Sequence, residues 1–209
     1  MNSALHHLEL VKSFHYNTYL HSLRVAMLAY KIGEIIELTS HELERLFLSA
    51  LLHDIGKTKL ARSILDKPGK LEAEEWGEIK KHPFYGIEIL RHDHQLLSND
   101  VIEGVYSHHE FFNGEGYPLG LRGEGIIVYA RVIAIADALD AMTTKRVYRP
   151  HQLSFEDAVE EVLKCKETQF DPYICNKIAG LARNSLKSSL SKIRGLYPLI
   201  DMTISGTKE

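Results

Sequence analysis

An acidic residue, Asp54, ends a run of helical core positions. It follows Ala50 by four residues and Phe47 by seven, so it shares the helix face that carries apolar side chains. Burying an unpaired carboxylate is costly, and Asp54 must therefore meet a metal, hydrogen-bond donors or a cation. Pairing with Lys57 at the helix end is an equally acceptable interpretation for Asp54 alone. The adjacent His53 favours a metal only slightly.

Two adjacent histidines, His108 and His109, lie at the end of a helix predicted over residues 99–110. His108 extends the apolar stripe of Val105 and His109 extends that of Ile102, so the two rings point about 100° apart. Neutral imidazole is the commonest protein ligand for transition metals. For an isolated pair, however, one buried, hydrogen-bonded histidine beside an exposed one is the better interpretation.

A second acid, Asp137, lies in the apolar segment 126–142. Asp140 follows three residues later on nearly the same face, and two acids so placed repel each other unless a positive group is close. Arg131 is more than one helical turn from either acid, so it cannot be that partner within the helix. A metal is the favoured explanation for Asp137.

His21 and His82 add two further imidazoles. Pro83 disfavours helical geometry at His82, and we expect a break there that turns the imidazole inward. The whole set is five histidines and two aspartates from at least four helices: His21, His53, Asp54, His82, His108, His109 and Asp137. Mixed nitrogen and oxygen ligands in this number fit two first-row metals better than one tetrahedral zinc.

Helical periodicity predicts the elements that carry these residues. Helices are expected over residues 16–37, 72–81, 84–91, 99–109, 126–142, 155–166 and 172–183, with one more from an N-cap at Ser40 to about Gly56. Asp171 is expected to cap the last helix, with Pro172 at its first position. Residues 113–125 hold five of the 14 glycines and predict a long irregular loop. No segment alternates with period two, so the predicted fold class is all-α.

Composition sets the context for this site. The 209 residues are 44% hydrophobic and 25% charged, as in an ordinary globular protein with a real core. A net charge of −3 gives no general attraction to a nucleic-acid polymer or an anionic membrane. No signal peptide and no membrane span are expected, and two cysteines without a pairing pattern are typical of a reduced protein. We expect a cytoplasmic location.

At these residues the sequence resembles the HD-GYP family, a branch of the HD phosphohydrolase superfamily. The resemblance covers about residues 15–182 and rests on an ordered series of motifs: His21-Ser-Leu-Arg-Val, Ala50-Leu-Leu-His-Asp-Ile-Gly-Lys57, Leu65-Asp-Lys-Pro-Gly-Lys-Leu71, Glu75-Trp76, Ile79-Lys-Lys-His-Pro83, His108-His-Glu110, Gly116-Tyr-Pro118, Ala136-Asp137, Arg146-Val-Tyr-Arg149 and Phe170-Asp-Pro172.

The resemblance implies an HD-type helical bundle with a Gly-rich loop around Gly-Tyr-Pro. The catalytic domain would span residues 15–195, between an N-terminal extension at 1–14 and a C-terminal tail at 196–209. One metal would be held by His21, His53, Asp54 and Asp137, and the other by His82, His108 and His109, with Asp54 bridging the two. Iron or manganese would be favoured. The substrate would be a cyclic dinucleotide, chiefly cyclic di-GMP.

The resemblance also implies roles around the metals. Lys57, Arg146 and Arg149 would contact substrate phosphates, and Tyr117 would shape the substrate mouth in a loop that can also bind a protein partner. The nucleophile would be a hydroxide held between the metals, with Asp54 bridging them and Lys57 either stabilising the transition state or assisting the leaving group.

Some residues depart from the family pattern. Phe111 and Asn113 stand where Arg and Asp are usual, which leaves the ligands intact but bears on the loop. Asn17 stands where some members have a glutamate that holds a third metal, so two metals are expected, although Asp140 remains available. The family domain is usually joined to a sensory domain, so this chain is expected to be a stand-alone enzyme or a fragment.

Two other functions are compatible with the pattern. A cyclic-dinucleotide receptor or interaction module could keep the fold with weak or no turnover, although a binding module does not need all seven ligands. HD folds with two irons can also carry out oxygen-dependent oxidations, and the phosphate-facing Lys57, Arg146 and Arg149 speak against that function.

Overall fold

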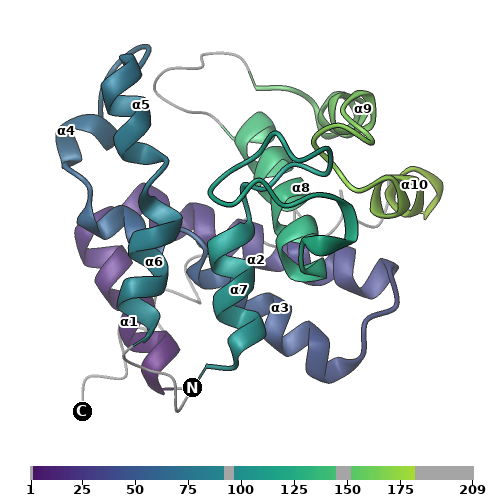
Figure 1. Cartoon of the computed structure of the whole chain (residues 1–209), viewed down its shortest axis with the longest axis horizontal. Helices are drawn as coiled ribbons and strands as arrows, with labels where there is room; N and C mark the ends of the chain where they lie inside the picture. Colours follow the sequence, from purple (N-terminus) through teal and green to yellow (C-terminus); the bar gives the residue numbers. More distant parts are fainter. Residues whose placement is uncertain (1, 92–96, 145–151, 182–209) are drawn as a thin grey trace.

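The structure, a computed structural model, describes residues 2–91, 97–144 and 152–181. The elements in chain order are α1 (Asn2–Phe14), α2 (Tyr16–Ile35), α3 (Ser40–Leu52), the 3₁₀ turn η1 (Ile55–Lys59), α4 (Arg62–Leu65), α5 (Ala73–Ile79), α6 (His82–Leu90), α7 (Asn99–Ser107), the 3₁₀ turn η3 (Gly123–Gly125), α8 (Val128–Thr143), α9 (Phe155–Lys164) and α10 (Pro172–Leu181) (Figure 1). The described residues form no β-strand beyond one isolated bridge, so the all-α prediction is confirmed.

Helix α2 runs through the interior of the bundle and packs against α3 and α8 (Figure 1). Val25, Leu28, Ala29 and Ile32 are fully buried on it, and they occupy more than one face of the helix. A helix that is apolar around much of its circumference must be enclosed by neighbours. As a result, α2 can present His21 to residues from both α3 and α8.

The start of α3 corrects one prediction. Thr39, not Ser40, is the N-cap: its hydroxyl accepts the Glu42 amide at 3.3 Å, and the Glu42 carboxylate accepts the Thr39 amide at 2.8 Å. This reciprocal capping box requires Glu three residues after the cap, a spacing that Thr39 has and Ser40 lacks.

The junction of α5 and α6 corrects a second prediction, that of a helix break at His82. His82 is helical and lies in the first turn of α6, with Lys81 as the N-cap. Pro83 is tolerated there because amides of the first turn have no partner within the helix. The imidazole still points inward, but the break that orients it lies before His82 rather than at it.

Helix α1 packs against α2 and η1, and Leu8 and Val11 are buried in the same core cluster as α2. The predicted boundary at residue 15 stays a prediction, and the predicted boundary at residue 195 lies outside the described residues. At the other end, Asp171 accepts the amides of Tyr173 and Ile174 at 2.7 and 3.3 Å, which confirms the predicted cap of α10. Among the described residues, no helix has the length and apolar character needed to cross a membrane.

Candidate metal centre

Three buried histidines are held in the same way by their own backbone. The Nδ1 atoms of His53, His82 and His108 each lie 2.6–2.7 Å from the carbonyl oxygen three residues earlier. A carbonyl oxygen only accepts, so Nδ1 carries the hydrogen and the neutral ring presents the lone pair of Nε2. Such second contacts fix ring orientation in metal sites. All three rings are thus set with Nε2 as the free donor atom.

None of these three Nε2 atoms accepts a hydrogen bond from a donor among the described residues. Nε2 of His82 lies 3.1 Å from Nε2 of His108, so two lone pairs face one another. Nε2 of His53 is buried and has no hydrogen-bond partner among the residues that the structure describes. One cation beside His82 and His108 and another beside His53 would satisfy these atoms, and the donor set therefore fits metal ions.

Two groups of donor atoms can hold a metal ion, each with its atoms within 4.8 Å of one another. We call His21, His53 and Asp54, with the neighbouring Asp137, the first ligand group; His82, His108 and His109 are the second ligand group. The structure thus brings together all seven residues predicted from the sequence.

The Asp54 carboxylate lies between the two groups, with 1% of its side chain exposed. Its Oδ2 is 3.6 Å from His21 Nε2 and 3.5 Å from His53 Nε2, whereas its Oδ1 is 3.4 Å from His82 Nε2. Lys57 Nζ also contacts Oδ2, at 2.7 Å. The pairing with Lys57 is therefore confirmed, and the same carboxylate faces the imidazoles, so the two interpretations do not exclude each other.

His21 is held between two acids of α8. Its Nε2 lies 3.1 Å from Asp137 Oδ1, and its Nδ1 lies 2.7 Å from Asp140 Oδ2. Asp140 is fully buried and also accepts Arg24, at two positions, and the Thr144 hydroxyl. Asp140 therefore orients His21 and neutralises Arg24. Both of its oxygens are engaged by these contacts, and the number of metals stays a prediction.

Protonation in the centre suits cation binding. Burial lowers the pKa values of His82 and His108 well below 6.5, and that of His109 to about 4. Burial would raise the pKa values of both acids, but Lys57 and the nearby imidazoles hold the pKa of Asp54 well below 3.8. Imidazoles, above all that of His21, do the same for the pKa of Asp137. At neutral pH the second ligand group therefore supplies neutral nitrogen donors, and the two acids supply ionised oxygen donors. Burial would lower the pKa of His21, but its bonds to Asp137 and Asp140 raise it above 6.5.

Gly56 brings the two ligand groups together, a role that sequence reasoning missed. A Cβ at this position would lie 1.9 Å from the His82 carbonyl oxygen and 2.5 Å from the Gly86 amide nitrogen. Only glycine therefore lets η1 pack directly against the first turn of α6. That approach places Asp54, two residues before Gly56, opposite His82.

The loop after α7 covers the second ligand group. The Tyr117 ring stacks on His109 with centroids 4.8 Å apart, and its amide donates to the His109 carbonyl at 3.1 Å. Glu110, 2% exposed, accepts the amides of Leu119 and Leu121 at 2.6 and 3.0 Å. This anchoring role of Glu110 was not predicted.

Phe111 and Asn113 depart from the family pattern, but backbone hydrogen bonds still hold the loop around them. The amides of Phe112 and Asn113 donate to the carbonyls of Gln169 and Thr168 at 3.1 and 2.9 Å. The Asn113 side chain accepts the Glu115 amide at 3.0 Å and donates to the Glu115 carboxylate at 2.8 Å. Asn113 therefore supports a local turn.

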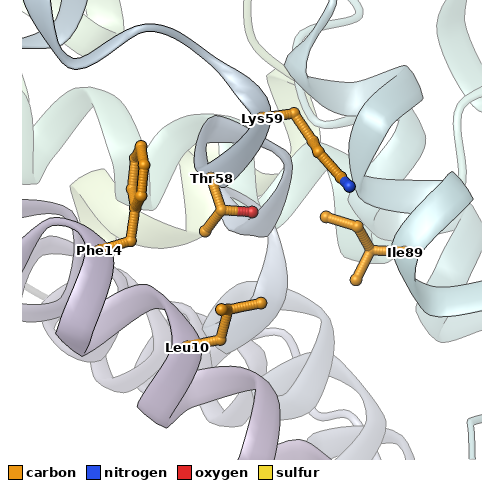
Figure 2. A pocket seen from close by; sticks show the side chains of 5 residues that line it. All are labelled: Leu10, Phe14, Thr58, Lys59 and Ile89. Atoms are coloured by element: carbon orange, nitrogen blue, oxygen red, sulfur yellow. The ribbon is translucent and has the colours of Figure 1, made fainter.

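A small cleft of about 130 Å³ opens beside the centre and is lined by His108, His109, Glu110, Phe111, Ala134, Asp137, Ala138 and Gln169. A larger hollow of about 360 Å³ lies elsewhere, between α1, η1 and α6 (Figure 2). Its lining is Leu10, Phe14, Thr58, Lys59 and Ile89, with one ionisable side chain, so it lacks the convergent polar groups of a reaction site. The predicted phosphate contacts Arg146 and Arg149 lie outside the described residues.

Comparison with known proteins agrees with this geometry. The family model described as "HD domain" matches residues 8–174. The chain belongs to the HD domain family. The resemblance drawn from the sequence is thereby confirmed, and a solved neighbour of this HD domain is an HDGYP protein from Bdellovibrio bacteriovorus, with 22% identity and a TM-score of 0.62 over 76% of this chain and 50% of that one.

Curated relatives of this HD domain are phosphodiesterases by name. A 3′3′-cGAMP-specific phosphodiesterase of Vibrio cholerae is 38% identical over 73% of this chain and 29% of its own length. A cyclic di-GMP phosphodiesterase of Pseudomonas aeruginosa is 36% identical over 75% of this chain and 37% of its own length. The chain thus spans about a third of the length of these relatives.

A solved structure of similar size gives the same fold. The HD domain of an L. monocytogenes phosphodiesterase, in complex with cyclic di-AMP, aligns with a TM-score of 0.63 at 18% identity. The alignment covers 91% of this chain and 96% of that one.

Proposed function

We propose that this HD domain is a metal-dependent phosphodiesterase that hydrolyses a cyclic dinucleotide, with cyclic di-GMP as the first substrate to test. The observation that carries the proposal is the placement of Asp54: each of its oxygens faces a different ligand group. The names of the curated relatives support the reaction class, and they include both cyclic di-GMP and 3′3′-cGAMP phosphodiesterases.

The first ligand group would hold one metal and the second ligand group another, with Asp54 shared between them. Iron and manganese both suit this mixture of imidazoles and carboxylates. Two divalent ions would bring four positive charges against two aspartates, which leaves a net positive centre for phosphate. When bound, such metals make water a strong nucleophile at neutral pH and withdraw charge from phosphoryl oxygens.

The remaining residues position the substrate. Lys57, held against Asp54 and 22% exposed, is placed to neutralise charge on the phosphate at the edge of the centre. Tyr117 would border the substrate, because its ring stacks on His109 of the second ligand group. Contacts from Arg146 and Arg149, a protein partner at the loop and a cytoplasmic location stay predictions.

The test is hydrolysis by protein purified without oxygen and loaded with Fe²⁺ or Mn²⁺. Cyclic di-GMP, 3′3′-cGAMP and cyclic di-AMP are supplied separately, and the products are separated by chromatography. We expect wild type to convert at least one of them and Asp54→Asn to convert none. If intact dinucleotide persists despite measured binding and full metal loading, the chain is a receptor and the enzyme proposal fails.

A further inference from the structure

Lys80 lies between two aromatic rings at the border of the metal centre. Its Nζ is 5.9 Å from the centroid of Trp76 and 5.3 Å from that of Tyr117. Trp76 belongs to α5, Lys80 ends that helix, and Tyr117 comes from the loop after α7. We call these three residues the aromatic–lysine cluster.

The cluster adjoins the second ligand group through a direct ring contact. Tyr117 stacks on His109 with 4.8 Å between centroids and an interplanar angle of 26°. From the metal ligand outward, the order is therefore His109, Tyr117, Lys80 and Trp76. The aromatic–lysine cluster therefore borders the metal centre on the side of Tyr117.

The charge of Lys80 is not neutralised by a neighbour. Within the described ranges, no carboxylate pairs with its ammonium, whereas Lys67 contacts Glu75 at 2.6 Å and Lys81 contacts Glu78. Aromatic faces attract an ammonium, but they carry no formal negative charge that would neutralise it. Lys80 therefore offers a cation beside the centre.

Trp76 is exposed on a fixed support. Its side chain is 47% exposed, although tryptophan usually buries most of its surface. The helix beneath it is anchored by Glu75, whose carboxylate accepts both the Glu72 amide at 2.7 Å and Lys67 Nζ at 2.6 Å. An exposed aromatic surface on a capped helix suits a flat ligand group, and a nucleobase is such a group.

We propose that the aromatic–lysine cluster binds the half of a cyclic dinucleotide that is not being cleaved. The base stacks on Trp76, and the second phosphate pairs with Lys80. This inference rests on the proposed function and adds a specificity subsite to it. A cyclic dinucleotide has two phosphates and two bases, so anchoring one half would hold the other half's phosphate at the metals.

Trp76 is the single tryptophan of the chain, so its fluorescence reports on this subsite alone. Stopped-flow mixing of the manganese-loaded full chain with cyclic di-GMP should quench the emission before product accumulates. Inorganic phosphate at the same concentration should not, because it has no base. Unchanged emission at saturating cyclic di-GMP would overturn the stacking role.

Kinetics of variants test the same subsite. Trp76→Ala and Lys80→Gln should each raise the KM for cyclic di-GMP about tenfold, or about 1.4 kcal/mol, with kcat within about twofold of wild type. Trp76→Phe and Lys80→Arg should recover most of the loss.

Matched controls are available on the neighbouring helix. Phe84→Ala removes an aromatic ring that is 46% exposed and lies about 200° around α6 from His82. Lys81→Gln removes the adjacent charge, which Glu78 already pairs. Both should keep the wild-type KM, and circular dichroism should show every variant folded.

The outcomes separate this inference from the proposed function. If wild type hydrolyses cyclic di-GMP but Trp76→Ala and Lys80→Gln keep its KM, the subsite is refuted and the enzyme stands. If nothing is hydrolysed but cyclic di-GMP quenches Trp76 and Lys80→Gln weakens that binding about tenfold, the subsite stands and the enzyme proposal fails.

Discussion

Replacing Asp140 with asparagine tests how the first ligand group is held. The carboxylate is fully buried and is bound by His21, Arg24 and Thr144. Burial would raise the pKa of Asp140, but His21 and Arg24 lower it from 3.8 to about 2. Since one pKa unit is about 1.4 kcal/mol, the ionised carboxylate stabilises the metal-free fold by about 2 kcal/mol.

The sign of the pH dependence follows from the lowered pKa. The contribution of Asp140 is fully present above pH 3.8 and is lost as the pH falls through about 2. Urea unfolding of the metal-free protein should therefore show Asp140→Asn about 2 kcal/mol less stable at pH 7. The difference from wild type should shrink towards pH 2.

Asp140→Asn should also lower the affinity of the first ligand group for its metal, although it removes none of the predicted ligands. Loss of an orienting carboxylate typically lowers metal affinity about 10- to 100-fold. Competition with a chelator should show this loss of affinity for the metal at the first ligand group only. The affinity of the second ligand group for its metal should stay at the wild-type value. The control, Asp100→Asn, removes a partly exposed pair with Arg45, whose two side chains are 29% and 27% exposed, and should cost less than about 1 kcal/mol. Wild-type stability and metal affinity in Asp140→Asn would refute the orienting role.

Three further predictions follow from single contacts. Gly56→Ala should destabilise the fold by about 1–3 kcal/mol and lower metal content, because its Cβ meets backbone atoms of α6; an unchanged melting temperature would contradict this. Glu110→Gln should speed proteolysis within residues 113–125 while metal content stays at the wild-type level, because the anchoring of the Leu119 and Leu121 amides is weakened; equal cleavage rates would refute the anchor. Lys57→Gln should lower kcat about 100-fold or more with both metals retained, and a wild-type kcat would exclude its role at the phosphate.

The ligand types could be predicted from the sequence because their burial has a cost that shows in the pattern. By sequence spacing Asp54 and Asp137 share a face with apolar positions, where an acid needs a counter-charge. In the structure Asp54 follows the end of α3 and is 1% exposed, and Asp137 is 23% exposed. The histidines carry no such signal individually, since a buried imidazole is satisfied by a single hydrogen bond. Their assignment came from the family resemblance, and the facing Nε2 atoms of His82 and His108 now support it on physical grounds.

Other features depend on tertiary contacts that local sequence does not encode. The partners of Asp140, His21 and Arg24, are more than 110 residues away, so their pairing could not be read from helix spacing. In the sequence Gly56 was interpreted as the end of a helix. Its role in the structure is to let the backbone of α6 approach η1 closely. The cap at Thr39 was missed by one residue, although the spacing to Glu42 did contain that signal.

The metal-to-protein ratio of wild type and Asp54→Asn, both purified without oxygen, tests the central claim most directly. If Asp54 is shared between the two ligand groups, elemental analysis should give about two transition-metal ions per wild-type chain and fewer than one per variant chain. Two ions retained by Asp54→Asn, or a single ion in the wild type, would contradict a centre built around this carboxylate.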